Sequence, residues 1–167
     1  MKDLPQVINA YMSRTTGLKE HCARCLRTER WGGSVVLMIV DAAFTSIGLN
    51  YFTAVVPKVM KFKEELVDCG KVKDLKSLSN LPEEKTQGIW RNKRSWQAAK
   101  SVASHLCELG KAEGLDERNA FRFWAANSQL ECWREDPIGK ISGVGITTFQ
   151  YLRMMGGVDT AMPDKIV

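Results

Sequence analysis

Ser34 to Leu49 reads SVVLMIVDAAFTSIGL, a mainly apolar segment that decides the fold. Its apolar residues fall on nearly every side of a helix, which is typical of a central, buried helix. Ser34 can cap the N-terminus of this helix. The polar residues Asp41, Thr45 and Ser46 then need hydrogen-bond partners or a cavity inside the protein.

Two longer segments downstream repeat their apolar residues at three- and four-residue steps, and each predicts an amphipathic helix. The first spans residues 50–69, contains one interior proline and ends before Gly70. The second spans residues 92–109, carries basic residues at its start and is followed by Gly110, a plausible stop signal.

Shorter helices are expected on either side of these segments. Asp116 can cap a helix whose apolar stripe continues to Cys132, before Asp136-Pro137 ends or redirects the chain. Residues 4–11 and 19–29 are compatible with two short helices. Strand patterns are weak, because the β-branched residues fall inside helical periods and no hairpin turn joins two alternating runs. We therefore expect an all-α fold.

The composition of the 167 residues excludes several classes of protein. With 44% hydrophobic and 26% charged residues, fibrous and disordered proteins are ruled out. Five scattered cysteines do not fit a secreted disulfide scaffold, so a cytoplasmic location is expected. The longest apolar run, Val35 to Val40, is far shorter than a membrane span, so we expect no membrane association. The net charge of +5 favours binding to polyanions but does not identify which polyanion is bound.

The segment most informative about function is residues 137–167, PIGKISGVGITTFQYLRMMGGVDTAMPDKIV. Residues 141–145, ISGVG, predict a tight turn between two helical segments, anchored by Ile141 and Val144. Gly143 and Gly145 permit conformations and close approaches that a side chain would block. The amides that open the following helix would face outward and suit a phosphate oxygen. A glycine-containing loop between two packed helices is the alternative.

The continuation of this segment resembles a known family. An apolar helix, a Gly156-Gly157 break and Met162-Pro163-Asp164, 19 residues beyond Gly145, follow the hairpin. The pattern is similar to the helix-hairpin-helix, glycine/proline-rich loop and aspartate signature of the endonuclease III (HhH-GPD) superfamily of DNA base-excision-repair glycosylases. Weaker similarity covers residues 42–50, AAFTSIGLN, and 87–95, QGIWRNKRS, so the resemblance extends over roughly residues 34–167.

The resemblance implies a two-lobed helical fold with DNA in the groove between the lobes. Residues 34–137 would form a barrel-like lobe. Residues 1–33 would join the chain after about residue 138 as the second lobe, and residues 138–167 would hold the hairpin and the loop with its aspartate.

Specific roles follow from the resemblance. Asp164 falls on the catalytic aspartate, which would stabilise positive charge on the deoxyribose or orient the attacking water. Read alone, Asp164 can also cap a helix starting at Lys165, and the two roles are compatible. The hairpin would clamp a phosphate through Gly143, Gly145, Ile146 and Thr147. The backbone carbonyls of Gly139, Ile141 and Val144 occupy the positions that hold a monovalent cation, Na⁺ or K⁺, and no other cofactor is required.

Residues upstream match further DNA contacts. Ile89 matches an apolar wedge that fills the gap left by an extruded base, although an ordinary buried aliphatic fits equally well. Basic residues would meet phosphates nearby, or form a solvated face: Arg91, Lys93 and Arg94. The pocket for the flipped base would draw on Thr45 and on at most one of four aromatic candidates, most of which should be core residues: Trp31, Phe44, Tyr51 and Trp90.

The sequence also departs from the family pattern. Thr147 stands where bifunctional members carry a lysine, and a hydroxyl cannot form the imine, so hydrolysis without strand cleavage is expected. Ala43 replaces a glutamine that probes the opposite strand, which leaves the lesion unassigned. The family's iron-sulfur loop would follow Asp164, so none is predicted in this chain. Cys22 and Cys25, after His21, form only half of a zinc site.

The prediction is a monomeric DNA glycosylase that hydrolyses the N-glycosidic bond of a damaged or mismatched base flipped from duplex DNA. It would be cytoplasmic and associated with the nucleoid when bound to DNA. A non-catalytic helix-hairpin-helix DNA-binding protein is the first alternative. A helical interaction protein, in which the hairpin is only a core turn, is the second.

Overall fold

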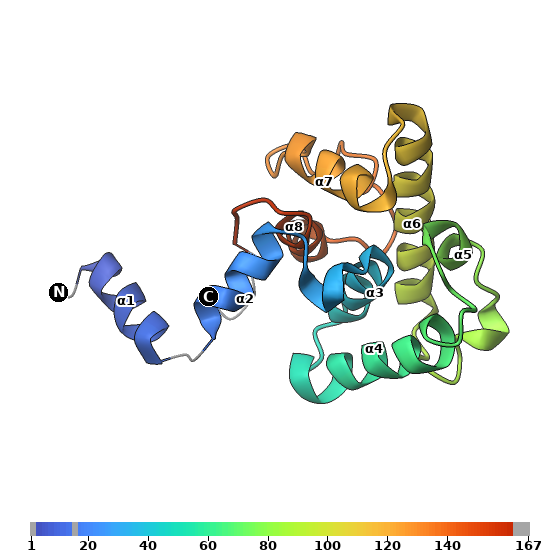
Figure 1. Cartoon of the computed structure of the whole chain (residues 1–167), viewed down its shortest axis with the longest axis horizontal. Coiled ribbons are helices and arrows are strands. Elements are labelled where there is room, and N and C mark those ends of the chain that lie inside the picture. The colour runs from blue at the N-terminus through green and yellow to red at the C-terminus, as the bar shows by residue number, and fades with distance from the viewer. Residues whose placement is uncertain (1–2, 15–16, 162–167) are drawn as a thin grey trace.

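The protein is described by a computed structural model that covers residues 3–14 and 17–161. Throughout these ranges the regular structure is helical, which confirms the all-α expectation (Figure 1). The α-helices are α1 (Leu4–Arg14), α2 (Leu18–Leu26), α3 (Val35–Thr45), α4 (Val56–Phe62), α5 (Leu75–Ser79), α6 (Lys93–Glu113), α7 (Glu117–Asn127) and α8 (Ile146–Met155).

Helix α3 forms the centre of the protein, and ten of its eleven residues are buried. Ser34 caps it as expected, because its side chain accepts a hydrogen bond from the amide of Leu37 at 3.3 Å. The helix ends at Thr45, four residues before the expected end at Leu49. Thr45 and Ser46 donate to the carbonyls of Asp41 and Ala43, at 2.8 and 2.6 Å, and such bonds favour helix ends.

The helix expected at residues 50–69 is present but not regular. Wide π-helical turns at Tyr51–Val55 (η2) and Lys63–Val67 (η3) flank α4. Pro57 lies at the start of α4 and has no amide to donate, so the preceding turn cannot close as a standard α-helix. The chain leaves this helical segment at Gly70, whose φ is +70°.

Helix α6 is longer than expected, and its stop signal is a different glycine. It continues through the buried Gly110 and ends at Gly114, which has a left-handed φ of +66°. A Cβ on Gly110 would lie 3.0 Å from the carbonyl oxygen of Leu115 and 3.3 Å from Cβ of Ala120. Gly110 is therefore a packing residue at the α6–α7 turn.

Helix α7 starts as expected and ends early. The side chain of Asp116 accepts from the amide of Asn119 at 2.8 Å, which confirms the cap. The helix stops at Asn127, so Cys132 is not on its stripe. Ser128 is extended there, and its hydroxyl donates back to the carbonyl of Ala125 at 3.0 Å.

The segment before the hairpin consists of turns, where a helix was expected. Asp136 organises them, because its Oδ1 accepts from the amides of Ile138 and Gly139 at 2.8 and 3.3 Å. Trp124 of α7 donates its indole N–H to the same carboxylate at 3.2 Å. The hairpin is thus tied to α7 before it turns into α8.

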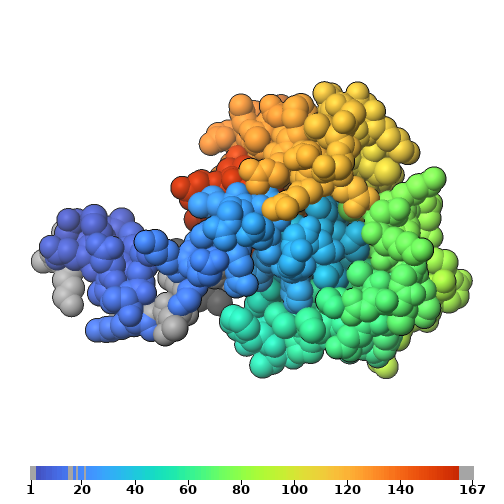
Figure 2. All heavy atoms as spheres, viewed as in Figure 1, coloured from blue at the N-terminus to red at the C-terminus, as the bar shows by residue number. Residues whose placement is uncertain are grey.

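Helix α1 stands away from the body of the molecule, and none of its residues is buried (Figures 1 and 2). Helix α8 packs mainly on α3, with further contacts to α2 and α7. The division into two lobes at residues 33 and 138 stays a prediction. Over the described ranges, no helix combines the length and the apolarity that crossing a lipid bilayer requires.

Candidate functional site

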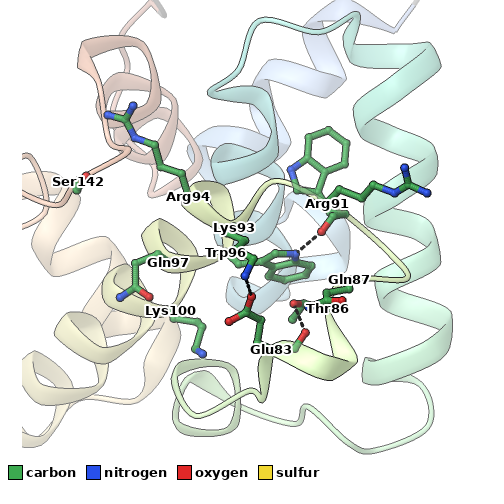
Figure 3. Close-up of a pocket in the computed structure, with 11 residues that line it drawn as sticks. Glu83, Thr86, Gln87, Arg91, Lys93, Arg94, Trp96, Gln97, Lys100 and Ser142 are labelled. Atoms are coloured by element: carbon green, nitrogen blue, oxygen red, sulfur yellow. Dashed lines mark hydrogen bonds and ion pairs between the residues drawn. The ribbon is translucent and has the colours of Figure 1, made fainter.

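A cavity of about 380 Å³ lies between the start of α6, the residues before it and the hairpin (Figure 3). We call it the basic groove. Its charged lining comprises four cations and one carboxylate, a net charge of +3: Arg91, Lys93, Arg94 and Lys100 against Glu83. Such an excess of positive charge in one cavity attracts anions.

One of these cations is already neutralised. Lys93 Nζ lies 2.5 Å from a carboxylate oxygen of Glu83, and both side chains are largely exposed (Figure 3). The hydrogen bond and charge of Lys93 hold the pKa of Glu83 below its ordinary value, and Glu83 raises the pKa of Lys93. Arg91, Arg94 and Lys100 form no hydrogen bond or ion pair with any part of the chain that is described, so they remain available to a ligand.

The hairpin packs directly on the basic part of α6. Gly143 has a φ of +98°, and a Cβ there would lie 3.1 Å from Cβ of Ala98 and 3.2 Å from Cγ of Arg94. Only glycine combines this backbone conformation with this approach. The anchoring role of Ile141 and Val144 is confirmed, since Val144 is buried and Ile141 packs against the core.

Helix α8 begins beside this contact without a side-chain cap. Its N-cap residue, Gly145, is exposed, and a Cβ there would meet no atom within 4 Å. Ile146 is exposed and Thr147 is half-buried. The helix start therefore lies at the surface, and at Gly145 no side chain covers the backbone.

The carbonyls predicted to hold a monovalent cation lie within the hairpin turns. The carbonyl of Ile141 accepts from the amide of Val144 at 2.9 Å and keeps a second lone pair. Gly139 has a structural reason to be glycine, because a Cβ would collide with the carbonyl oxygen of Trp133. The cation stays a prediction.

Three residues predicted to touch DNA or a flipped base are buried in the core, and of these Trp90 also lines the basic groove. Ile89 is only 2% exposed, so it does not present a wedge at the surface. Phe44 is buried and stacks on Trp90, with ring centroids 4.4 Å apart, which leaves no room for a base between them. The cause is local, since the amides of Ile89 and Trp90 both donate to the carbonyl of Thr86 and fold this loop inward.

The buried carboxylate of Asp41 joins residues from four parts of the chain. Its Oδ2 accepts from the indole N–H of Trp31 at 2.7 Å, from the hydroxyl of Tyr151 at 2.9 Å and from that of Tyr51 at 3.0 Å. Arg30 Nε lies 3.3 Å from the same oxygen and also donates to Tyr51. We call these five residues the Asp41 cluster. It answers the expectation that Asp41 needs partners.

The two phenols and the guanidinium of this cluster keep their protons near neutral pH. Burial, and then the negative charge of Asp41, raises the pKa of both Tyr51 and Tyr151, so both phenols keep the protons that they donate. Burial alone would lower the pKa of Arg30. Tyr151, Tyr51 and Asp41 outweigh that effect and raise it, so the guanidinium stays charged.

A second cavity, of about 260 Å³, opens on one side of the Asp41 cluster. We call it the aromatic pocket, and its lining is Arg24, Arg30, Trp31, Tyr51, Phe52 and Val56. Of the four aromatic candidates for a base pocket, Trp31 and Tyr51 line this cavity. Thr45 is half-buried one helical turn from Asp41 and bonds to its backbone carbonyl.

Trp31 has a backbone conformation that a tryptophan rarely adopts. Its φ and ψ are +53° and +35°, a left-handed geometry that costs a residue with a side chain about 1–2 kcal/mol. The segment before it is held by α7, because Arg122 donates to the hydroxyl of the buried Thr28 at 3.0 Å. The fold therefore maintains a strained aromatic residue beside an open cavity, and such strain concentrates at functional sites.

The predicted catalytic residue, Asp164, lies outside the described residues. The last described residues lie along α8, where the side chain of Gln150 donates to Thr160 at 2.9 Å and to the carbonyl of Ala161 at 3.3 Å. Within the described ranges, no group of three or more His, Cys, Asp or Glu side chains could hold a metal ion. Of the two cysteines in the half-site, Cys22 is exposed and Cys25 is buried.

Comparison of the chain with family models, with curated proteins and with solved structures finds no match.

Proposed function

We propose that this protein binds duplex DNA along the basic groove and the hairpin, and hydrolyses the N-glycosidic bond of a damaged or mismatched base. The observation that carries the proposal is the packing of the glycine hairpin on the basic start of α6. Gly143 touches Arg94 and Ala98, and the groove beside them has a net charge of +3.

The groove and the hairpin offer two kinds of phosphate ligand at one place. Arg91, Arg94 and Lys100 supply unpaired cations, which bind phosphates independently of sequence. The exposed start of α8 supplies backbone amides and the positive end of a helix dipole. Together they favour a sugar-phosphate strand running past the hairpin.

Base removal needs a carboxylate that is free to act, and Asp164 is the residue proposed for it. Asp41 does not suit this role, because it is fully buried and its Oδ2 already accepts from four neighbours. Thr147, at the start of α8, has a hydroxyl and no amine, so the proposed reaction is hydrolysis without strand cleavage.

The binding part of the proposal is tested by reversing charge in the groove. Arg94→Glu combined with Lys100→Glu should weaken binding to a duplex and lower the slope of log K against log salt by about 2. Lys111→Glu combined with Lys73→Glu is the matched control, since it makes the same change in net charge at two exposed lysines that do not line the groove. Equal effects of both changes would reject the groove as the DNA-binding surface.

The catalytic part is tested with a panel of lesion-containing duplexes at saturating protein. Asp164→Asn should abolish base release and leave DNA affinity unchanged. Borohydride should trap no covalent adduct, because Thr147 cannot form an imine. Base release by the Asp164→Asn variant, or a trapped adduct, would contradict the mechanism.

A second candidate function is DNA binding without catalysis. It is favoured by the burial of Ile89 and of the stacked Phe44–Trp90 pair, because base extrusion needs residues that replace the base in the stack. Binding that depends on the groove, without release of any base in the panel, would support this candidate.

A further inference from the structure

We propose that the aromatic pocket binds a single nucleotide unit, an aromatic base with one phosphate, and that Asp41 is the positioning residue that holds the pocket walls. If the bound nucleotide is part of DNA, this inference rests on the proposed function and identifies the part of the DNA that enters the pocket. The experiments below allow the pocket and the groove to fail separately.

The pocket combines aromatic surface with an unpaired cation. Trp31, Tyr51 and Phe52 line it, and Phe52 is 79% exposed although phenylalanine is among the residue types most often buried. Rings of this kind stack on bases of any identity. The volume of about 260 Å³ is below the ~300–1,000 Å³ of sites for drug-sized ligands, and therefore suits one small ring system.

The positive charge at the rim of the pocket favours a phosphate group beside the base. Arg24 and Arg30 line the pocket, and the Asp41 carboxylate behind it compensates one of these two charges. Arg24 is exposed and forms no hydrogen bond or ion pair with the residues that the structure describes. The remaining charge of +1 at the rim matches a phosphate next to the ring.

Asp41 fixes the walls of the pocket because its buried carboxylate accepts hydrogen bonds from the residues that form them. Its Oδ2 accepts from Trp31 and Tyr51, which lie on separate segments, and from Tyr151 on α8. Arg30 lies over the ring of Tyr51, with its central carbon 5.5 Å from the ring centroid. Neither Trp31 nor Tyr51 can move without breaking a bond to a buried carboxylate.

The Asp41 cluster also includes a residue of α8. Tyr151 of the Asp41 cluster follows Thr147 by four residues, so the two side chains share one face of the helix and lie one turn apart. The start of α8 at the hairpin is thus about one helical turn from the Asp41 cluster.

The test measures binding of free nucleosides and of deoxynucleoside 5′-monophosphates by calorimetry. The monophosphates should bind more tightly than the matching nucleosides. Arg24→Ala should remove this difference, a loss of about tenfold for the monophosphate and none for the nucleoside. Phe52→Ala should weaken both ligands by about tenfold. Arg27→Ala and Phe123→Ala are the controls, because neither residue lines the pocket.

The role of Asp41 is tested by the same titration with Asp41→Asn and, as a milder change, Tyr51→Phe. Both variants should lower the affinities for the nucleoside and for the monophosphate by the same factor. The near-ultraviolet circular dichroism signal of Trp31 should also change, and the Trp31→Phe variant identifies that signal. Weaker binding of the monophosphate alone would overturn the positioning role.

The two sources of the ligand are separated with DNA. If the bound nucleotide is part of DNA, Arg24→Ala and Phe52→Ala should lower the affinity for a duplex with an extruded base more than the affinity for an undamaged duplex. If it is a free nucleotide, they should affect mononucleotides alone. Absence of nucleotide binding, or equal binding of benzoate, would overturn the pocket proposal, whereas an intact response to Arg94→Glu with Lys100→Glu would leave the groove proposal standing.

Discussion

The basic groove and the Asp41 cluster use charged residues in opposite ways. In the groove, cations outnumber the carboxylate four to one, and most of them have no partner among the described residues. In the cluster, one carboxylate oxygen receives four donors and is shielded from water. Unpaired surface charge is available to a ligand, whereas paired buried charge fixes the positions of its neighbours. Each of the following changes tests one side of this contrast.

The largest effect is expected at Asp41. Asp41→Asn removes the charge that pairs with Arg30 and should lower the free energy of unfolding by about 3–5 kcal/mol in urea denaturation. The control is Asp68→Asn, which breaks the exposed Lys63–Asp68 pair and should cost less than about 1 kcal/mol. Similar losses would show that the cluster is not a structural centre. If Asp41→Asn does not fold, Tyr151→Phe should cost about 1 kcal/mol.

The contact between the hairpin and α6 gives the next effect. Gly143→Ala introduces strain at a φ of +98° and crowds Arg94 and Ala98, and should cost about 2–3 kcal/mol. Gly48→Ala also has a positive φ, +71°, but meets no atom within 4 Å, so it should cost only about 1–2 kcal/mol. Only Gly143→Ala should also weaken DNA binding in a titration. Loss of DNA affinity in both variants would reject the hairpin as a specific contact.

Alkaline titration distinguishes the buried phenols from ordinary ones. Because the folded protein raises the pKa of Tyr51 and Tyr151, their contribution to stability is complete below the unfolded value of about 10 and is lost as pH rises through the folded values. Absorbance at 295 nm should therefore show two phenols ionising late, together with unfolding. Ionisation of Tyr51 and Tyr151 near pH 10 without unfolding would contradict the description of the cluster.

The smallest effect is expected at the paired cation of the groove. Glu83→Gln releases Lys93 and should strengthen DNA binding about two- to threefold at low salt, with little change in stability. The matched control is Glu113→Gln, at the far end of α6 and not in the groove. Unchanged affinity at low salt would show that Lys93 does not reach the DNA.

Local patterns in the sequence predicted the helices well and their ends less well. The caps at Ser34 and Asp116 were predicted correctly, because a cap depends on the amides of its own helix. Gly110 was wrong as a stop signal, because its role is set by Leu115 and Ala120 on the next segment. Ile89, predicted as a wedge, is buried by a loop that folds on Thr86, which no periodicity reveals.

The candidate site was predictable only in part, for the same reason. The basic residues at the start of α6 were identified from the sequence, and so was the need of Asp41 for partners. Its partner Tyr151 lies 110 residues away, and Arg24 and Phe52 meet across a cavity that no motif contains. A spacing rule relates residues on one helix, whereas these contacts join different ones.

By itself, the sequence determined that the protein is helical, that the apolar helix following Ser34 is its centre and that a glycine turn is followed by a helix. Periodicity and caps act within a few residues, so they can be read along the chain. The tertiary structure alone decided which charges are exposed and which are buried, and therefore which can bind a ligand. That choice depends on how helices pack, because the cost of burying a charge is set by neighbours that are distant in sequence.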